Sequence, residues 1–237
     1  MRPITEIARA IDLSPDDLLQ AGPYLAKLSW DAAERLRTRP PRGKLVLVSA
    51  MTPTRYGEGK TTTSIGLTQG LVARGHRAIA ALREPSLGPC FGAKGGGTGG
   101  GLATLEPSVK INMHCTGDLH AITSANNLLA ALADNAMHFQ APVPLKLISW
   151  KRCLDLNDRF LRHAVIGLRG QAHGTPREEG FDITAASEVM AVLCLADGLE
   201  DLKRRLGRLI VGTDSAGKPV TAADLKAVGA MAALLSE

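Results

Sequence analysis

The sequence predicts an α/β protein in which a parallel sheet is flanked by helices in a three-layer, Rossmann-like arrangement. Two short apolar runs, residues 45–48 and 78–82, have the unbroken hydrophobic character of parallel strands that are buried on both faces. Between them lie a glycine-bearing loop and a helix expected from about Lys60 to Arg74, and Gly75 stands where helices commonly end. Strand, helix and strand in this order form a βαβ unit, whose crossover is almost always right-handed.

Helices are expected before this unit and alternate with strands after it. Residues 1–41 read as a short helical lead-in, with Ser14 and Pro15 at one helix start and Ser29 capping a helix over 30–37. Residues 42–237 form the main α/β domain. In that domain we expect helices over 118–133, 184–196, 199–206 and from Thr221 onward, and strands over 145–148, 165–168 and 209–211.

Composition excludes several classes of protein. The chain has 237 residues, 45% of them hydrophobic, and a net charge of +5. No apolar run approaches the roughly 18 residues of a membrane span, and the charged N-terminus does not read as a signal peptide. Four cysteines without close spacing fit a reducing cytoplasm better than a disulfide scaffold. Scattered basic residues and only 3% aromatic residues argue against nucleic-acid binding. We therefore expect a cytoplasmic enzyme or binding domain.

A phosphate-binding loop follows the first expected strand. Gly59-Lys60-Thr61 opens a helix directly after an apolar run, which is the context that a P-loop requires. Its backbone N–H groups and the helix N-terminus would surround phosphate oxygens, Lys60 would reach the outer phosphates, and Thr61 would bind Mg²⁺. Thr54 stands where the usual first glycine belongs, so a turn that merely starts a helix is the alternative. The expected nucleotide-binding residues are Thr54, Arg55, Tyr56, Gly57, Glu58, Gly59, Lys60, Thr61 and Thr62. The fold is accordingly predicted to be P-loop NTPase-like, with 42–237 as its nucleotide-binding domain.

Arg83 and Glu84 end the second expected strand. Because ligands bind beyond the carboxyl ends of parallel strands, Arg83 would face the same sheet edge as the phosphate loop and could hold a second anion. A surface ion pair between Arg83 and Glu84 is the equal alternative. Seven of the ten residues 92–101 are glycine, and we expect this segment to be a loop that a ligand or close packing keeps ordered.

These segments together resemble the formate–tetrahydrofolate ligase family over essentially the whole chain. The resemblance begins at Thr52-Pro53-Thr54 and Gly57–Thr62 in the phosphate loop and continues in order along the sequence. The further motifs that carry it are residues 83–89, 91–92, 94–96, 99–101, 111–112, His114, 116–118, 120–121, 127–131, 155–159, 181–183, 186–191 and 217–221. Arg55 and Tyr56 depart from the family's usual proline and small residue, and Val109 and Lys110 replace a usually acidic pair.

The resemblance implies an ATP-dependent ligase that joins formate to tetrahydrofolate through formyl phosphate and yields 10-formyltetrahydrofolate. It implies Lys60, Arg83 and Glu84 as catalytic residues, with Arg83 holding formate and Glu84 orienting Arg83 or assisting a cation. ATP and Mg²⁺ are the implied cofactors, and a monovalent cation is a further candidate. Members of the family are more than twice as long, so we expect a homo-oligomer or a partner chain that supplies the missing portion.

Two other functions remain open at this point. A non-catalytic nucleotide-binding module derived from the ligase would retain the loop but lack formate-dependent turnover. A partner-switching ATPase with a deviant phosphate loop would carry a lysine early in the loop, where this chain has Thr54 or Arg55. ATP binding without a response to formate would separate the module from the enzyme.

Overall fold

The computed structural model describes residues 1–54, 56–168, 170 and 172–236. The chain forms two compact units. Unit 1 comprises residues 1–85 and 93–116, and unit 2 comprises residues 86–92 and 117–237. Residues 41 and 42 both lie in unit 1, and the domain boundary expected between them stays a prediction.

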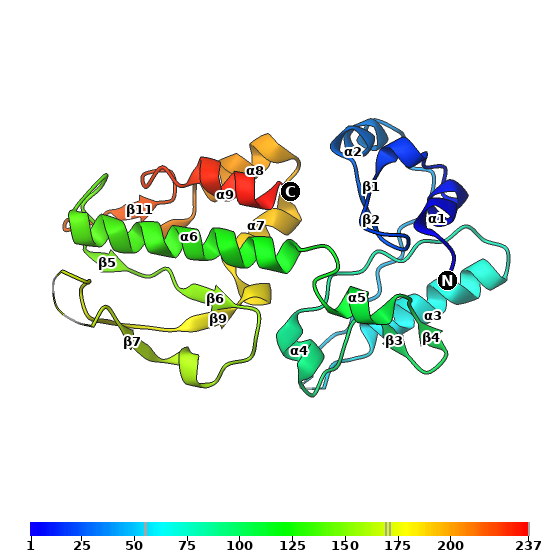
Figure 1. Ribbon diagram of the computed structural model, residues 1–237, viewed down its shortest axis with the longest axis horizontal. Coiled ribbons are helices and arrows are strands. Elements are labelled where there is room, and N and C mark those ends of the chain that lie inside the picture. The colour runs from blue at the N-terminus through cyan, green and yellow to red at the C-terminus, as the bar shows by residue number, and fades with distance from the viewer. Residues whose placement is uncertain (55, 169, 171, 237) are drawn as a thin grey trace. The chain divides into compact units, whose positions relative to one another are not determined.

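Unit 1 holds the helical lead-in and the phosphate loop (Figure 1). Ser29 caps α2 by accepting a hydrogen bond from the Ala32 N–H, as its sequence position predicts. The helix expected after Ser14 is only one 3₁₀ turn, because residues 18–28 turn back as an antiparallel hairpin. The elements of unit 1 are α1 (Ile4–Ala10), η1 (Pro15–Asp17), β1 (Leu18–Gln20), β2 (Ala26–Leu28), α2 (Trp30–Arg37), α3 (Lys60–Ala73), β3 (Gly99–Gly100), β4 (Ala103–Thr104) and α5 (Ser108–Asn112).

Unit 2 is built around one long helix, α6 (Asp118–Phe139). In Figure 1 this helix lies between helices α7–α9 and the strands β6 and β9. Its buried side chains, among them Leu119, Ile122 and Leu129, recur at helical spacing and form the centre of the core. The other elements are α4 (Leu87–Phe91), β5 (Leu147–Ile148), β6 (Arg152–Leu154), η2 (Phe160–Arg162), β7 (Ala164–Ile166), β8 (Arg177–Glu179), β9 (Phe181–Ile183), η3 (Thr184–Ala186), α7 (Glu188–Leu195), α8 (Leu199–Leu206), β10 (Ile210–Thr213), β11 (Pro219–Thr221) and α9 (Val228–Leu235).

The sheets are small and mostly antiparallel. In the described parts of the chain, β10 lies between β11 and β5, and the other sheets are the strand pairs β1–β2, β3–β4, β6–β9 and β7–β8. Among the strand pairs of the described residues, only β6–β9 is parallel, with Arg152 opposite Phe181 and Leu154 opposite Ile183. The α/β class is confirmed, whereas the single parallel sheet of a P-loop NTPase-like fold is not observed among these residues.

The strands predicted on either side of α3 are not formed, which corrects the expectation for residues 45–48 and 78–82. Neither segment pairs with a described strand, and Leu45 and Leu47 are 95% and 83% exposed. A continuous apolar run indicates that a segment favours burial, but a strand forms only when another strand satisfies its backbone N–H and C=O groups. The prediction of buried strands at these two runs is therefore wrong for the described chain.

Two helices expected in unit 2 are present. Helix α8 has the predicted bounds, and α6 begins at the predicted Asp118 and extends to Phe139. The expected helix over 184–196 is divided at Ser187 into η3 and α7. The Ser187 hydroxyl caps α7 by accepting a hydrogen bond from the Met190 N–H. Thr221 ends β11 instead of opening a helix, because Asp224 accepts hydrogen bonds from both its N–H and its hydroxyl in a turn. Such side-chain turns compete with helix formation at the same residues.

Candidate functional site

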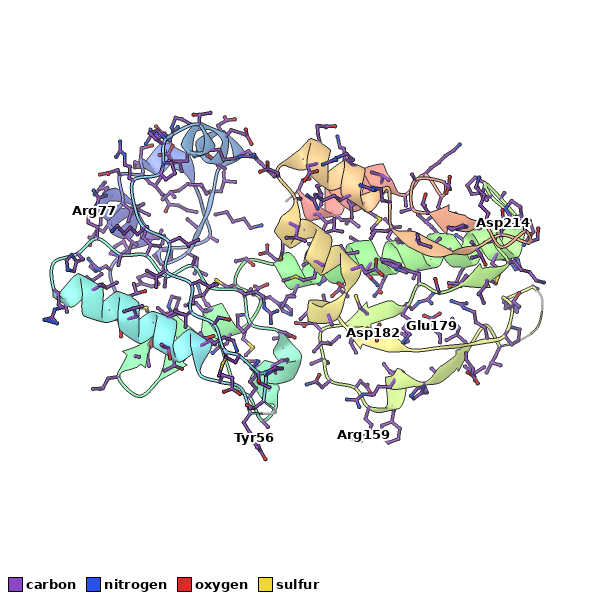
Figure 2. The ribbon with its side chains drawn as sticks, turned by 180° about the vertical axis from the view of Figure 1, so that it is seen from behind. Tyr56, Arg77, Arg159, Glu179, Asp182 and Asp214 are labelled. Carbon is purple, nitrogen blue, oxygen red and sulfur yellow. The ribbon has the colours of Figure 1, made fainter. Side chains whose placement is uncertain are left out.

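The predicted phosphate loop in unit 1 is a closed turn that leads into α3. The Gly57 N–H donates to the Thr54 carbonyl at 3.2 Å, and the Thr54 hydroxyl donates back to the Gly57 carbonyl at 3.2 Å. Gly57 and Gly59 have φ angles of +87° and +72°, the left-handed conformation that glycine adopts without strain. Arg55 lies outside the described residues, and Tyr56 is 71% exposed, with its ring directed away from the protein in Figure 2.

Helix α3 presents an N-terminus that no side chain caps. Gly59 is the N-cap residue, Lys60 is the first helical residue, and the first turn contains no acidic side chain. Helix geometry leaves the first N–H groups without intrahelical acceptors, and the helix dipole makes this end positive. Lys60 and Thr62 are exposed and Thr61 is half-buried, so the loop can accept an anion from solvent. Glu58 is also exposed and lies at the same turn.

The glycine-rich segment packs against α3. Strands β3 and β4 lie beside the helix, and a Cβ on Gly99 would be 3.0 Å from Cδ1 of Ile65, a fully buried residue of α3. The Gln69 amide of α3 donates to the Thr104 carbonyl of β4 at 3.1 Å. The sequence predicted that either a ligand or close packing keeps this segment ordered, and the structure shows close packing against α3.

Arg83 and Glu84 have different environments. Arg83 is exposed and forms no ion pair with a described residue, so the predicted alternative of an Arg83–Glu84 pair is not observed. Glu84 is half-buried, and its Oε1 accepts a hydrogen bond from the Thr116 N–H at 2.8 Å. Glu84 therefore ties the end of the 78–84 segment to the loop before α6. No described residues form a group of three or more His, Cys, Asp or Glu side chains suited to a metal ion.

A buried carboxylate that sequence reasoning missed holds the segment directly after Arg83 and Glu84. In unit 2, Asp155 is 7% exposed and Ser86 is 1% exposed. The Ser86 hydroxyl donates to Asp155 Oδ1 at 2.5 Å, and the Leu87 N–H donates to Asp155 Oδ2 at 2.9 Å. Gly88 has no space for a side chain, since a Cβ there would lie 2.9 Å from the Asn157 nitrogen. Residues 83–89 and 155–159 both belong to the motifs of the family resemblance, and this was the available signal. It did not indicate that the two segments touch.

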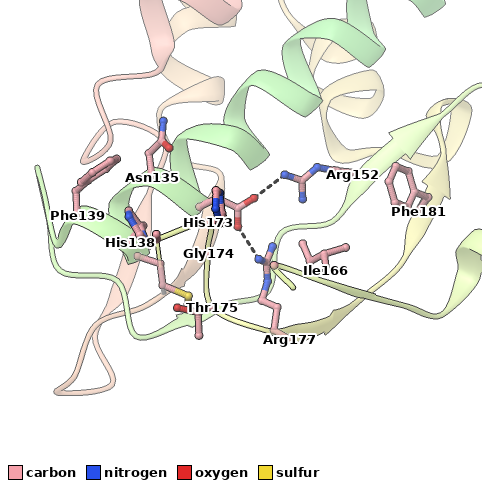
Figure 3. A pocket seen from close by; sticks show the side chains of 14 residues that line it. Asn135, His138, Phe139, Arg152, Ile166, His173, Gly174, Thr175, Arg177 and Phe181 are labelled. Carbon is pink, nitrogen blue, oxygen red and sulfur yellow. Dashed lines mark hydrogen bonds and ion pairs between the residues drawn. The ribbon is translucent and has the colours of Figure 1, made fainter. Parts of the chain in front are cut away.

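Unit 2 also contains a cavity of about 500 Å³ at the C-terminal end of α6 (Figure 3). Arg152 and Arg177 both pair with Asp134 there, at 2.5 and 2.6 Å, and with the buried Glu179. Burial lowers the pKa of Arg152, but its hydrogen bonds to Asp134 and Glu179 outweigh that effect and raise the pKa. The carboxylates already pair with both guanidinium groups, so this cluster joins α6 to β6 and β8. His138, His173 and Thr175 complete the wall in Figure 3.

Comparison with known proteins decides the family. The family profile described as "Formate--tetrahydrofolate ligase" matches residues 1–237. The chain belongs to the formate–tetrahydrofolate ligase family. Proteins named formate–tetrahydrofolate ligase from Myxococcus xanthus (strain DK1622) and Zymomonas mobilis subsp. mobilis are 58% and 53% identical to it over 239 aligned positions.

Membership in the formate–tetrahydrofolate ligase family confirms the resemblance drawn from the motifs. The alignments cover all of this chain and 43% of each relative, so the chain spans less than half the length of these ligases. No helix in the described ranges is both long and apolar enough to cross a membrane. The glycine-bearing turn that leads to the uncapped start of α3 is the candidate site of this chain.

Proposed function

We propose that this chain carries the phosphate-binding and formate-activating part of a formate–tetrahydrofolate ligase. The observation that carries the proposal is the turn at Thr54–Gly57, which leads through two left-handed glycines to Lys60 at the uncapped start of α3. Backbone N–H groups, a positive helix end and a lysine at one place favour a triphosphate. The substrates are ATP, formate and tetrahydrofolate, and the product is 10-formyltetrahydrofolate.

The reaction assigns a separate task to each residue of the site. A formate oxygen attacks the γ-phosphorus of ATP, which breaks its bond to the β,γ-bridging oxygen and releases ADP. The N10 amine of tetrahydrofolate then attacks the formyl carbon of formyl phosphate, loses its proton and releases inorganic phosphate. Lys60 and the N–H groups of the loop residues 54–62 stabilise the charge that develops on the phosphoryl oxygens. Arg83, exposed and without an ion-pair partner among the described residues, holds formate and then formyl phosphate.

Mg²⁺ fits the site as a companion of ATP. The Thr61 hydroxyl lies in the first turn of α3, where P-loop proteins place a Mg²⁺ ligand. The ion would neutralise phosphate charge when the nucleotide is bound. For a monovalent cation the support is weaker, because Glu84 already accepts a hydrogen bond from the Thr116 N–H. We therefore assign Glu84 to holding the loop and propose no cation at its carboxylate.

The cysteines indicate the compartment in which the chain works. Four free cysteines suit a reducing compartment, and we propose the cytoplasm.

We further propose that tetrahydrofolate is held with help from a second copy of this chain or from a partner chain. A nucleotide-binding module without ligase activity is the competing function, and the same assay separates the two.

The test measures formyl transfer by the purified 237-residue chain with ATP, formate and tetrahydrofolate. The assay is run with this chain alone and with the part of a relative that this chain does not cover added as a second polypeptide. Formate-dependent formation of 10-formyltetrahydrofolate in either mixture supports the ligase. ATP binding without formate-dependent turnover in both mixtures would favour the module. Absence of ATP binding by the folded chain would contradict both.

A further inference from the structure

A second lysine lies at the phosphate loop, although it comes from a different part of the sequence. A Cβ built on Gly57 would be 3.0 Å from Cε, 3.3 Å from Cγ and 3.7 Å from Cδ of Lys94. The aliphatic stem of Lys94 therefore lies along the open face of Gly57. Its ammonium group is one covalent bond beyond Cε and therefore lies near the loop that leads to Lys60.

The protein holds this lysine in place by packing its neighbours. The Asn112 side chain accepts a hydrogen bond from the Gly97 N–H at 2.8 Å and donates to the Thr98 hydroxyl at 3.3 Å. A Cβ on Gly96 would lie only 2.5 Å from Asn112 Oδ1, so the glycine is needed for this approach. Beyond Thr98 the segment docks on α3 through Gly99 and Ile65. Lys94 is thus carried by a segment that is fixed on the helix of the phosphate loop.

Among the described residues, neither Lys60 nor Lys94 has a carboxylate partner. Lys94 and Lys60 are exposed, and neither forms an ion pair with any residue in the described ranges. Two ammonium groups that flank one loop without a counter-ion repel one another. A polyanion relieves this repulsion, and flexible lysines interact with phosphates as point charges.

We propose that Lys94 is a second phosphate-binding residue of this site and contacts the outer phosphates of the nucleotide together with Lys60. The proposal rests on the proposed function, since it takes the loop to bind ATP. A side chain at Gly57 would also press on the Lys94 stem, because its Cβ would lie 3.0 Å from Cε. The favoured ligand is a nucleoside triphosphate rather than a monophosphate, because two ammonium groups attract the additional negative charge of a second and third phosphate group.

The test compares Lys94→Ala, Lys94→Arg and the control Lys110→Ala by calorimetry with ATP, ADP and AMP. Lys110 is exposed and lies in α5 of the same unit, so its loss removes one charge from the same region. Lys94→Ala should weaken ATP binding roughly 10- to 100-fold. AMP binding should change little, Lys94→Arg should retain part of the affinity, and the ATP affinity of Lys110→Ala should stay within about threefold. Circular dichroism and melting temperature verify that each variant is folded.

Lysine acetylation of the unchanged protein provides an independent measurement. ATP should protect Lys94 from an acylating reagent, adenosine should not, and Lys110 should react equally in both cases. Wild-type ATP affinity in Lys94→Ala, or equal acetylation of Lys94 with and without ATP, would overturn the proposal while Lys60→Ala still tests the loop. If Lys60→Ala also binds ATP normally, the proposed function itself is wrong, so the two failures are distinguishable.

Discussion

Replacing Asp155 by alanine should release the segment that directly follows Arg83 and Glu84. The carboxylate accepts hydrogen bonds from the Ser86 hydroxyl and the Leu87 N–H, and both Ser86 and Asp155 are buried. Leaving a buried donor without an acceptor costs about 1–3 kcal/mol, and this cost applies in full to the Ser86 hydroxyl and in part to the half-buried Leu87 N–H. Asp155→Ala should therefore reduce the free energy of unfolding by about 1–4 kcal/mol. Asp155→Asn keeps the shape and one acceptor oxygen and should lose less.

Denaturation and hydrogen exchange measure this effect globally and locally. The exposed Asp158→Ala, three residues further along, is the matched control, since it removes a carboxylate that accepts from the Phe160 N–H at 2.9 Å. Protection of the Leu87 amide should fall tenfold for each ~1.4 kcal/mol lost in Asp155→Ala and stay unchanged in the control. A loss of stability below about 1 kcal/mol, together with unchanged Leu87 protection, would refute the assignment of Asp155 as the anchor.

Further predictions concern the loop, the formate residue and the thiols. Lys60→Ala should lower ATP affinity at least tenfold by calorimetry and leave the melting temperature unchanged; an unchanged affinity would contradict the phosphate-loop assignment. Arg83→Ala should nearly retain ATP affinity but abolish formate-dependent phosphate transfer; equal loss of both would count against its separate role. Burial raises the pKa of the Cys153 thiol, which keeps it protonated where an ordinary thiol ionises. Maleimide at pH 8 should therefore label the exposed Cys194 well before Cys153, and simultaneous labelling in the folded protein would be incompatible with this environment.

The family and the local elements were accessible from the sequence. Helix α8 has the predicted bounds, and Ser29 caps α2 as expected, because helices depend on hydrogen bonds between residues three or four apart. Residues 57–61, with their two glycines, lysine and threonine, predicted a loop that opens a helix; phosphate binding there stays a prediction. The start of α3 at Lys60 agrees with that local prediction.

Pairing between distant residues was decided by the tertiary structure alone. The apolar runs 45–48 and 78–82 indicated strands, but strand formation depends on partners elsewhere in the chain, and the described residues supply none. Likewise, only the fold brings Ser86 to Asp155 and Lys94 to Gly57. Sequence by itself determined the family and the start of α3 at Lys60, because these depend on residue type and short spacing. Tertiary structure determined which side chains meet, because those contacts are non-local.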